Sequence, residues 1–463
     1  MDENKENLHG TPDNSGKLDR IMVFARSHLS LLIILAGTAL ILIFIIGSVT
    51  RAIQKGIYEH RITYASSSIA KSRQDELDEE ESLLLEEAAL LARHYDYAAA
   101  AKLLKGFSGD MIEHPKLLRK YEEYTAASHD VVLWSDPDTI LHLSFQNLIA
   151  DPDRAFSDVR NRATFKSSYI TTSEFTSILQ QLYNNDYVLV RLSDITTSSG
   201  AKNLYLPAGK KPLVITQTSV NYYTFTLDSD GDKLPDAGGS GFASKLVLDA
   251  NGYITCEMVD SSGNTVYGAY DLVPILDSFI ETHPGFSYKG AKAVLAVTGY
   301  DGLFGYRTNP EAREHFGDAY YSNELEGASQ IAQALRDSGY ELACYTYGNE
   351  AYGALSAEQI SDEMSRWKTE VAPILGFTNV FVFAKKSDIG TNGKNYRTEK
   401  FDALYSAGFR YFIGFCESAE PWYSSHGNYV RQGRILVTGN DLLYSPGLYE
   451  GLFDTATVLD GAR

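Results

Sequence analysis

The stretch KPLVITQTSVNYY, residues 211–223, decides the fold of this chain. Its first half is a short apolar run, and such a run predicts a buried strand when turn residues bound it. The run is followed at once by Gln217, Thr218 and Ser219. Functional groups of α/β domains gather where such strands end, at the carboxyl edge of the sheet. The stretch therefore predicts a buried strand that presents Thr218 and Ser219 at a functional edge.

Strands and helices alternate along the chain from Val131 to its end. The predicted strands lie at 140–145, 187–192, 213–216, 293–297, 340–345, 380–383 and 409–415. The predicted helices between them lie at 173–184, 271–282, 322–338, 356–375 and 398–407. Such alternation predicts a parallel sheet, either open or closed into a barrel. We therefore expect residues 131–463 to form one α/β domain.

Residues 74–128 carry a helical pattern of apolar residues. The first predicted helix, 86–105, is followed directly by Gly106 as a stop signal, and the second, 115–127, begins with Pro115. The pair resembles one tetratricopeptide-type hairpin, and one such unit is not expected to bury its own apolar face. We interpret it as a spacer docked on the main domain, with a partner-binding groove as the alternative.

Residues 29–50, LSLLIILAGTALILIFIIGSVT, form an uncharged run between Arg26 and Arg51. At about 1.5 Å per residue the run just crosses a hydrocarbon core of roughly 30 Å. It is longer than the apolar region of a signal peptide, and no small-residue cleavage pattern follows it closely. We predict a disordered cytoplasmic tail at 1–28, an uncleaved transmembrane signal anchor at 29–50 and a helical stalk at 51–130. Basic residues flank the run on both sides, so charge alone does not set its orientation.

Charge and cysteine content exclude two further classes. The formal net charge is −19, and no basic stripe is available to neutralise phosphates, which argues against nucleic-acid binding. The three cysteines, Cys256, Cys344 and Cys416, are scattered along the chain. They show neither the spacing of metal ligands nor a disulfide framework.

Several segments of the domain resemble the polysaccharide deacetylases, the NodB-homology family that is also classed as carbohydrate esterase family four. The segments are 211–223, LQQLYNNDYVLVRLSDI at 179–195, AVLAVTGYDGLFGYRT at 293–308, YVRQGRILVTG at 429–439 and LFDTATVLD at 452–460. The resemblance covers most of 131–463 and implies a distorted (β/α) barrel, preceded by the transmembrane helix and the helical hairpin and placed outside the cell. Active members are metal-dependent amide hydrolases, in which an ion held by Asp, His and His polarises the acetamide carbonyl and a second aspartate takes the proton.

The positions that carry this chemistry in the family hold other residues here. The two consecutive aspartates of the first motif fall on Thr218 and Ser219, and the two histidines spaced four apart fall on Tyr345 and Asn349. A phenol has a pKa of about 10 and is a poor ligand near neutral pH. Asn349 offers one neutral oxygen. The resemblance therefore implies a barrel with no cofactor and without the family's base.

Two more family positions differ, and the cleft is expected to change its character. The histidine that often follows the first strand falls on Gln146, and the Pro-aromatic-Gly turn of the third motif falls on 384–386, where Lys385 and Lys386 stand. We expect aromatic side chains to line the old cleft with these residues: Tyr222, Tyr223, Tyr345, Tyr347 and Trp422. Aromatic faces there would stack on sugar rings.

Residues 228–236, DSDGDKLPD, place four carboxylates around a glycine turn: Asp228, Asp230, Asp232 and Asp236. Carboxylates at this spacing wrap Ca²⁺, and the string resembles a thrombospondin type 3 calcium repeat. One copy is present, and the glutamate that closes an EF-hand loop is missing. Two interpretations stay open: a polar hairpin loop, or a structural Ca²⁺ loop at the rim of the cleft.

Three other polar residues are assigned no chemistry. His315 and His426 each lack a second histidine at ligand spacing, so both are expected to be solvated or hydrogen-bonded. Asp388 is expected to cap a loop.

These patterns together predict a single-pass protein of the cell membrane whose extracellular barrel binds cell-wall glycan or a surface protein. Two alternatives stay open. The first is an active metal-dependent carbohydrate N-deacetylase with a rebuilt site, which bound metal and acetate release would reveal. The second is a membrane assembly scaffold that acts through the hairpin at 86–127, and deletion of the hairpin would then abolish assembly.

Overall fold

The computed structural model describes Thr38 and residues 73–197, 200–228, 240–391, 393–416, 418 and 420–463. Among these residues, no helix is both long enough and apolar enough to cross a membrane. The predicted tail at 1–28 lies outside the described residues, as does the predicted anchor at 29–50 apart from Thr38. The first part of the predicted stalk, 51–72, also lies outside them.

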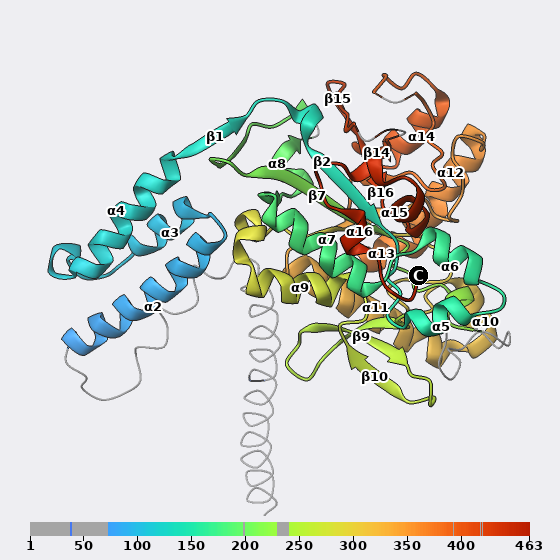
Figure 1. Cartoon of the computed structure of the whole chain (residues 1–463), viewed down its shortest axis with the longest axis horizontal. Coiled ribbons are helices and arrows are strands. Elements are labelled where there is room, and N and C mark those ends of the chain that lie inside the picture. Colours follow the sequence, from blue (N-terminus) through green and yellow to red (C-terminus); the bar gives the residue numbers. More distant parts are fainter. Residues whose placement is uncertain are drawn as a thin grey trace, which may run out of the picture. The chain divides into compact units, whose positions relative to one another are not determined.

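Seven parallel strands close into a barrel, whose strands occupy the centre of the view in Figure 1. In order around the ring they are β7 (Lys211–Thr218), β11 (Val294–Val297), β12 (Glu341–Cys344), β13 (Val380–Val382), β14 (Tyr411–Phe415), β16 (Val430–Leu436) and β2 (Leu141–Phe145). Every neighbouring pair is parallel, and the pairing of β2 with β7 closes the ring. The predicted α/β barrel is confirmed. The alternation of strands and helices was compatible with an open sheet or a closed barrel, and the structure has the closed barrel.

Two further strands pair with strands of the ring. The strand β3 (Tyr187–Leu189) pairs with the start of β7, while β11 pairs with the end of β7 on the same side. The strand β15 (Tyr423–Ser425) lies antiparallel to β16. The predicted strand at 187–192 is too long, because the Asp194 carboxylate accepts a hydrogen bond from the Arg191 amide at 3.0 Å and starts a helical turn there.

The barrel strands are buried on both faces, as parallel strands covered by helices are. On β2, Leu141, Leu143 and Phe145 belong to the outer core between strands and helices. His142 and Ser144 alternate with them and are fully buried, so they point into the barrel. The floor of the interior is filled by small and branched side chains: Val214, Val294, Ala296, Ala343, Val380, Val382 and Ile413.

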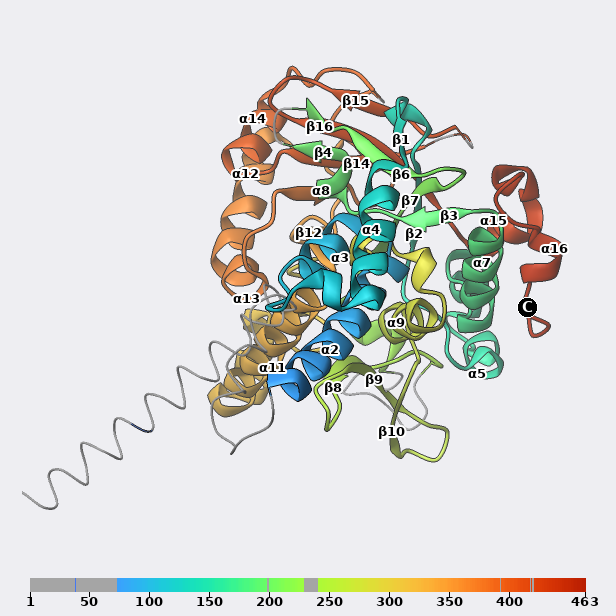
Figure 2. The same cartoon turned by 90° about the vertical axis from the view of Figure 1, so that its left-hand side faces the viewer.

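Helices surround the strands, as Figure 2 shows from the side. They include α7 (Thr172–Asn184), α9 (Leu272–Thr282), α11 (Asp318–Asp337), α12 (Ala357–Arg366), α14 (Glu399–Ser406) and the short α13 (Ala372–Leu375). Capping boxes start two of them, from Thr171 for α7 and from Ser356 for α12. The predicted helix at 356–375 is interrupted by a π-helical turn, Trp367–Val371, just before Pro373. Proline has no amide hydrogen and so cannot continue the regular ladder.

A second, smaller sheet was not predicted. It is antiparallel and consists of β8 (Lys245–Leu248), β9 (Ile254–Val259) and β10 (Thr265–Gly268). Burial alternates strictly along β9, which is typical of a strand with one face on a core and the other in solvent. The remaining short elements are α5 (Pro152–Ser157), α6 (Arg162–Ser168), α8 (Leu192–Ile195), α10 (Pro310–Phe316), α15 (Gly439–Tyr444), α16 (Thr455–Val458), β1 (Val131–Trp134), β4 (Thr196–Thr197), β5 (Gly200–Ala201) and β6 (Leu204–Pro207).

The helices that precede the barrel number three within 73–130: α2 (Arg73–Arg93), α3 (Tyr97–Leu104) and α4 (Pro115–His129). The predicted continuous helix at 86–105 is wrong. The chain turns at Tyr95, whose φ is 61°, and Asp96 caps α3 by accepting a hydrogen bond from the Ala99 amide at 3.3 Å.

The same three helices bury an apolar core of their own, contrary to the expectation for a single hairpin. Its fully buried members are Ala88, Ala100, Leu104 and Leu117. Hydrogen bonds join the turn after α2 to the domain: the Lys289 amide donates to His94 O at 2.7 Å, and His94 Nδ1 lies 3.1 Å from Ser287 O.

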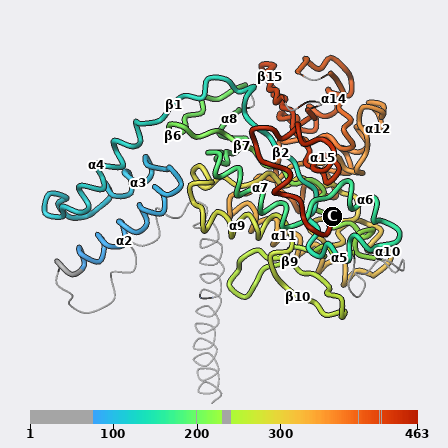
Figure 3. The backbone as a smooth tube through the Cα atoms, viewed as in Figure 1, coloured from blue at the N-terminus to red at the C-terminus, as the bar shows by residue number. Residues whose placement is uncertain are grey.

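The C-terminal end of the chain lies beside α6 (Figure 3) and is held there by a buried ion pair. Arg463 Nη2 lies 2.6 Å from Glu174 Oε2, and the two side chains are 2% and 0% exposed. Arg463 also donates to Tyr169 O at 2.8 Å. The start of α7 and the end of the chain are thus linked by one carboxylate–guanidinium contact.

Candidate functional site

The carboxyl ends of the barrel strands carry a concentration of left-handed backbone. Outside glycine, a positive φ occurs at two positions after each of four neighbouring strands: Ser219, Tyr222, Asp301, Phe304, Thr346, Asn349, Lys385 and Lys386. Such conformations cost about 1–3 kcal/mol each where they are sparsely populated, and they cluster at active and ligand-binding sites. This end of the barrel, which we call the mouth, is therefore the candidate site.

The four positions that the resemblance assigns to catalysis lie at the mouth. Thr218 is 1% exposed, and its hydroxyl donates to Phe145 O at 3.2 Å. Ser219 follows Thr218 directly. The Tyr345 amide donates to Val297 O at 2.7 Å, and this hydrogen bond continues the β11–β12 pairing to the mouth. Tyr345 and Asn349 are half-buried. The side chains available here are thus hydroxyls, a phenol and an amide.

Tyr223 is the aromatic residue most closely tied to these positions. It is 5% exposed, and its phenol lies 3.2 Å from Thr298 Oγ1. Burial raises the pKa of Tyr223, while hydrogen bonds with Thr298 and Ser219 act to lower it. The phenol therefore stays protonated at neutral pH and serves as a hydrogen-bonding group.

A polar layer fills the barrel interior below the mouth. His142 Nε2 lies 2.7 Å from Thr216 Oγ1, and its Nδ1 lies 3.1 Å from Gln432 Oε1. The Tyr411 hydroxyl donates to the same Gln432 oxygen at 2.7 Å. Burial, and then the charge of Arg434, lowers the pKa of His142 to about 3, so this imidazole is neutral in the folded chain at physiological pH.

Arg434 stands above this layer and is also fully buried. Its guanidinium donates to Ser144 Oγ at 3.2 Å, to the carbonyls of Ile413 and Gly414 at 3.1 and 3.2 Å, and to Phe383 O at 2.8 Å. Its central carbon lies 4.0 Å from the ring centre of Phe415 and 5.9 Å from that of Tyr345. Burial lowers the pKa of Arg434 to about 10, which leaves it charged at neutral pH.

No carboxylate among the described residues forms an ion pair with Arg434. A fixed cation therefore lies close to Tyr345, one of the two positions to which the resemblance assigns a metal-binding histidine. Neither Arg434 nor His142 was predicted as a site residue. The signal was present, because residues of β16 and β2 that alternate with outward-facing apolar residues must point inward.

The buried His142 should make the free energy of unfolding depend on pH. Its folded pKa is about 3 and its ordinary value is 6.5, so the unfolded chain takes up the proton first. The stabilising contribution is complete above pH 6.5 and is lost as the pH falls toward 3. We expect the free energy of unfolding to fall by about 2–3 kcal/mol more in the native chain than in His142→Asn between pH 6.5 and 4.5. Denaturant titrations at each pH measure this difference, and parallel pH profiles would contradict it.

The residues predicted to line the cleft fall into two groups. Gln146 is half-buried and donates to Ser168 O at 3.0 Å. Lys385 and Lys386 are exposed at the mouth, with Lys385 Nζ 3.6 Å from Glu350 Oε2. Tyr345 and Trp422 are half-buried, as Gln146 is, so solvent reaches these predicted residues as well.

The structure buries Tyr222 and Tyr347, while Trp422 is half-buried on the outer side of the barrel wall. Tyr222 is 2% exposed and belongs to the outer core. Tyr347 is 4% exposed and donates its hydroxyl to the Glu370 carboxylate. Trp422 donates to Phe415 O at 3.2 Å, and its ring covers the outward face of β14 and β16 at two glycines, Gly414 and Gly433.

Asp388, expected to cap a loop, does accept a hydrogen bond from the Gly390 amide at 3.1 Å. It also forms a buried ion pair with Arg431, whose Nη2 lies 2.8 Å from Asp388 Oδ2. His426 lies 2.7 Å from Ser424 Oγ and stacks on Tyr429, as expected for a hydrogen-bonded side chain. All three cysteines are free.

The acidic loop is described only at its first residue. Asp228 follows a helical turn and donates its amide to Thr224 O at 2.8 Å. Asp230, Asp232 and Asp236 lie outside the described residues, so the Ca²⁺ interpretation stays a prediction. Among the described residues, the group of three side chains able to ligate a metal is Asp78, Glu81 and His114, in α2 and at the start of α4.

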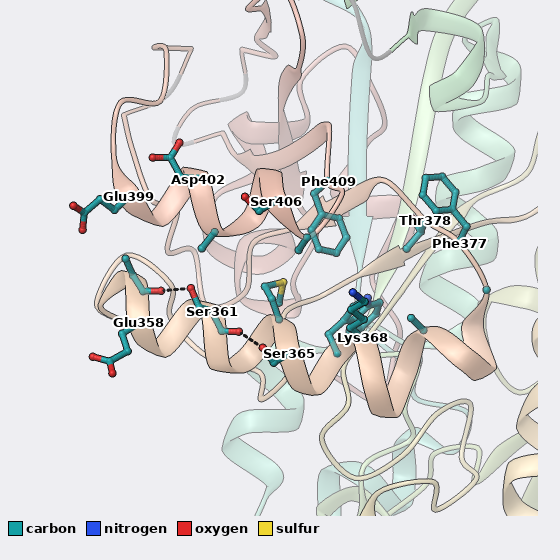
Figure 4. A pocket seen from close by; sticks show the side chains of 17 residues that line it. Glu358, Ser361, Ser365, Lys368, Phe377, Thr378, Glu399, Asp402, Ser406 and Phe409 are labelled. Carbon is teal, nitrogen blue, oxygen red and sulfur yellow. Dashed lines mark hydrogen bonds between the residues drawn. The ribbon is translucent and has the colours of Figure 1, made fainter.

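A cavity of about 640 Å³ lies between α12 and α14. Figure 4 shows its carboxylates, Glu358, Glu399 and Asp402, at one end and Phe377 and Phe409 at the other. Thr378 and Phe409, which line it, precede β13 and β14. The cavity therefore opens toward the amino ends of the strands, opposite to the mouth.

No family model matches the chain, and no curated protein matches it. Several solved structures are similar to it. The deacetylase PplD of Streptococcus pyogenes, in complex with acetate, has 12% identity and a TM-score of 0.36, over 67% of this chain and 94% of that one. A de-N-acetylase from Aggregatibacter actinomycetemcomitans has 10% identity and a TM-score of 0.35, over 65% and 95%.

A putative polysaccharide deacetylase of Bacillus anthracis has 8% identity and a TM-score of 0.33, over 67% of this chain and 66% of that one. All three are described as deacetylases, the class of protein that the sequence resembles, and the chain is similar to them at 8–12% identity.

Proposed function

We propose that this chain is a deacetylase-like protein of the cell surface that binds glycan at the mouth of its barrel without hydrolysing it. The observation that carries the proposal is the buried Arg434 guanidinium beneath Tyr345, with the ring centre 5.9 Å from the guanidinium carbon. Residues 29–50 would anchor the barrel to the membrane, as the apolar run predicts.

The charge of Arg434 opposes the chemistry of the family. A divalent ion about 6 Å from a guanidinium meets a repulsion of about 5–6 kcal/mol at an effective dielectric constant of 20. Carboxylates normally offset such a cost at metal sites, but the aligned positions hold Thr218 and Ser219. A hydroxyl and a phenol offer neither a negative charge nor a base near neutral pH.

The mouth keeps the groups that glycan binding needs. Tyr345 offers a half-exposed ring, Gln146 and Asn349 offer amides, and Lys385 and Lys386 offer exposed ammonium groups. Hydroxyl-rich ligands are held by such a mixture of an apolar face and a few placed polar groups. Tyr345 is thus the expected stacking residue in place of the buried Tyr222 and Tyr347, and Trp422 lies on the outward face of β14 and β16.

The test uses the full-length chain in detergent, without an affinity tag, with Zn²⁺ or Co²⁺ and an N-acetylglucosamine oligomer. We expect the oligomer to bind and no acetate to appear above the protein-free level. Tyr345→Ala should weaken binding by about tenfold, a loss of about 1.4 kcal/mol, while Tyr345→Phe keeps the ring and the affinity. Tyr253, which is 73% exposed and directly precedes β9, supplies the matched control Tyr253→Ala.

Two outcomes would overturn the proposal. Acetate release that survives loss of Asp78 and His114 would show hydrolysis supported by metal at the mouth, in favour of a rebuilt deacetylase site. Absence of both binding and acetate would leave the assembly scaffold, whose test is deletion of the helices between 73 and 130.

A further inference from the structure

Three side chains that can ligate a metal converge outside the barrel, in the helices that precede it. Asp78 and Glu81 come from α2, and His114 directly precedes Pro115 at the start of α4. Their ligand atoms all lie within 4.8 Å of one another. Positions three apart share one face of a helix, so α2 presents the two carboxylates together to the imidazole.

The imidazole is held in place by its surroundings. His114 is 5% exposed, and its ring packs edge-on against Phe107, with 4.7 Å between ring centres. Its amide donates to Met111 O at 3.1 Å, and its Nδ1 lies 2.5 Å from Glu81 Oε2. A ring fixed in this way costs little further ordering when it takes a ligand.

The N-terminal half of α2 is strongly acidic. Five of the six residues at 76–81 are acidic, and no lysine or arginine occurs from 74 to 92. His114 supplies at most one positive charge, and it already lies on Glu81. Glu80 is not part of this group of three ligands, because it accepts hydrogen bonds from the amide and hydroxyl of Ser108. A divalent cation would neutralise both Asp78 and Glu81 at once.

We propose that Asp78, Glu81 and His114 bind a divalent transition-metal ion, with Zn²⁺ as the best fit, and that the ion clamps α2 to the start of α4. One imidazole and two carboxylates form a three-ligand Zn²⁺ set that leaves the fourth position to water. Zn²⁺ distances of about 2.0–2.2 Å place tetrahedral ligands about 3.3–3.6 Å apart. The exposed side chain of Asp78 can rotate to close the remaining gap.

An imidazole ligand favours Zn²⁺, Co²⁺ or Ni²⁺ over Ca²⁺ and Mg²⁺, which prefer oxygen donors. The site is separate from the mouth and does not depend on glycan binding. Its consequence is structural. The ion would join residues 33 apart in sequence across the two helices, and binding to the folded form alone stabilises that form.

The test is a titration of the tag-free, full-length chain with Co²⁺, followed by displacement with Zn²⁺. We expect one equivalent of Co²⁺ to give the absorption of a tetrahedral complex, and Zn²⁺ to remove it. Asp78→Asn should weaken binding by about 100-fold, because it removes a ligand outright and even supporting groups contribute 10–100-fold. The side chain of Asp78 is exposed, so this variant is expected to fold.

The matched control is Glu80→Gln, which removes a neighbouring charge without touching the three ligands and should bind Co²⁺ as the native chain does. His114→Asn should abolish the absorption, and circular dichroism verifies that its helices remain. The proposal is overturned if the native chain gives no tetrahedral Co²⁺ spectrum at about 100 µM metal. Equal binding by the native chain, Asp78→Asn and His114→Asn would overturn it as well, since the metal would then lie elsewhere.

Discussion

Arg463→Met is expected to lower the free energy of unfolding by about 3–5 kcal/mol, because removing one partner of a buried ion pair leaves the other charge uncompensated. The partner, Glu174, is 0% exposed and lies 2.6 Å from the guanidinium. Glu174 also accepts the Thr171 amide at 2.8 Å and so closes the capping box of α7. Chemical denaturation followed by tryptophan fluorescence measures the loss.

The matched control is an ion pair of the same length at the surface. Arg313 Nε lies 2.6 Å from Asp318 Oδ1, but the two side chains are 60% and 79% exposed. Exposed pairs contribute about 0–1 kcal/mol, so Arg313→Met should change stability little. Similar losses in the two variants would show that burial does not set the strength of the C-terminal contact.

Asp388→Ala is expected to have an effect of similar size, about 3–5 kcal/mol. It removes the counter-charge of Arg431, which is 0% exposed and lies 2.8 Å from the Asp388 carboxylate. The guanidinium carbon is 4.0 Å from the ring centre of Tyr396, and the Tyr396 hydroxyl donates to Asp388 at 2.7 Å. The loss of one carboxylate therefore leaves both a cation and a phenol without their partner.

A double variant distinguishes an uncompensated charge from lost packing. Asp388→Leu with Arg431→Leu removes both charges, and replacement of a buried pair by apolar residues costs far less than removal of one partner. We expect the double variant to be more stable than Asp388→Ala in the same denaturant titration. If it were less stable, the contribution of this pair would lie in its hydrogen bonds and shape.

The strands of the barrel could be predicted from local stretches of sequence, while the partners of the buried charged residues could not. The apolar run that starts β7 and the polar residues that end it are consecutive in sequence, so both strand and edge were predicted. Asp388 was predicted only to cap a loop. Its ion pair with Arg431 was not predicted, because Arg431 lies 43 residues away in sequence. The turn at Tyr95 was missed because α2 and α3 are both alanine- and leucine-rich and no glycine or proline separates them.

The aromatic residues show the same limit. A tyrosine side chain near a strand end points either to the mouth or into the core, and neighbouring residues decide which. Tyr347 turns toward Glu370 on the π-helical turn, and the absence of a side chain at Gly299 leaves room for its ring. Tyr345, two residues earlier, faces the mouth. The sequence predicted both Tyr345 and Tyr347 to line the cleft. Only the packing of helices against strands decides that Tyr347 is buried and Tyr345 is not.

The order of strands and helices and the polar edge after β7 could be predicted from the sequence, because each depends on residues that are close along the chain. The ring also requires pairing between β16 and β2, which lie near opposite ends of the domain in sequence and bring Leu436 opposite Ser144. The environment of Arg434 is likewise assembled from the carbonyls of two other segments, at Phe383 and at Ile413. Contacts of this kind exist only after distant strands meet, and they place a buried cation beside Tyr345 at the mouth.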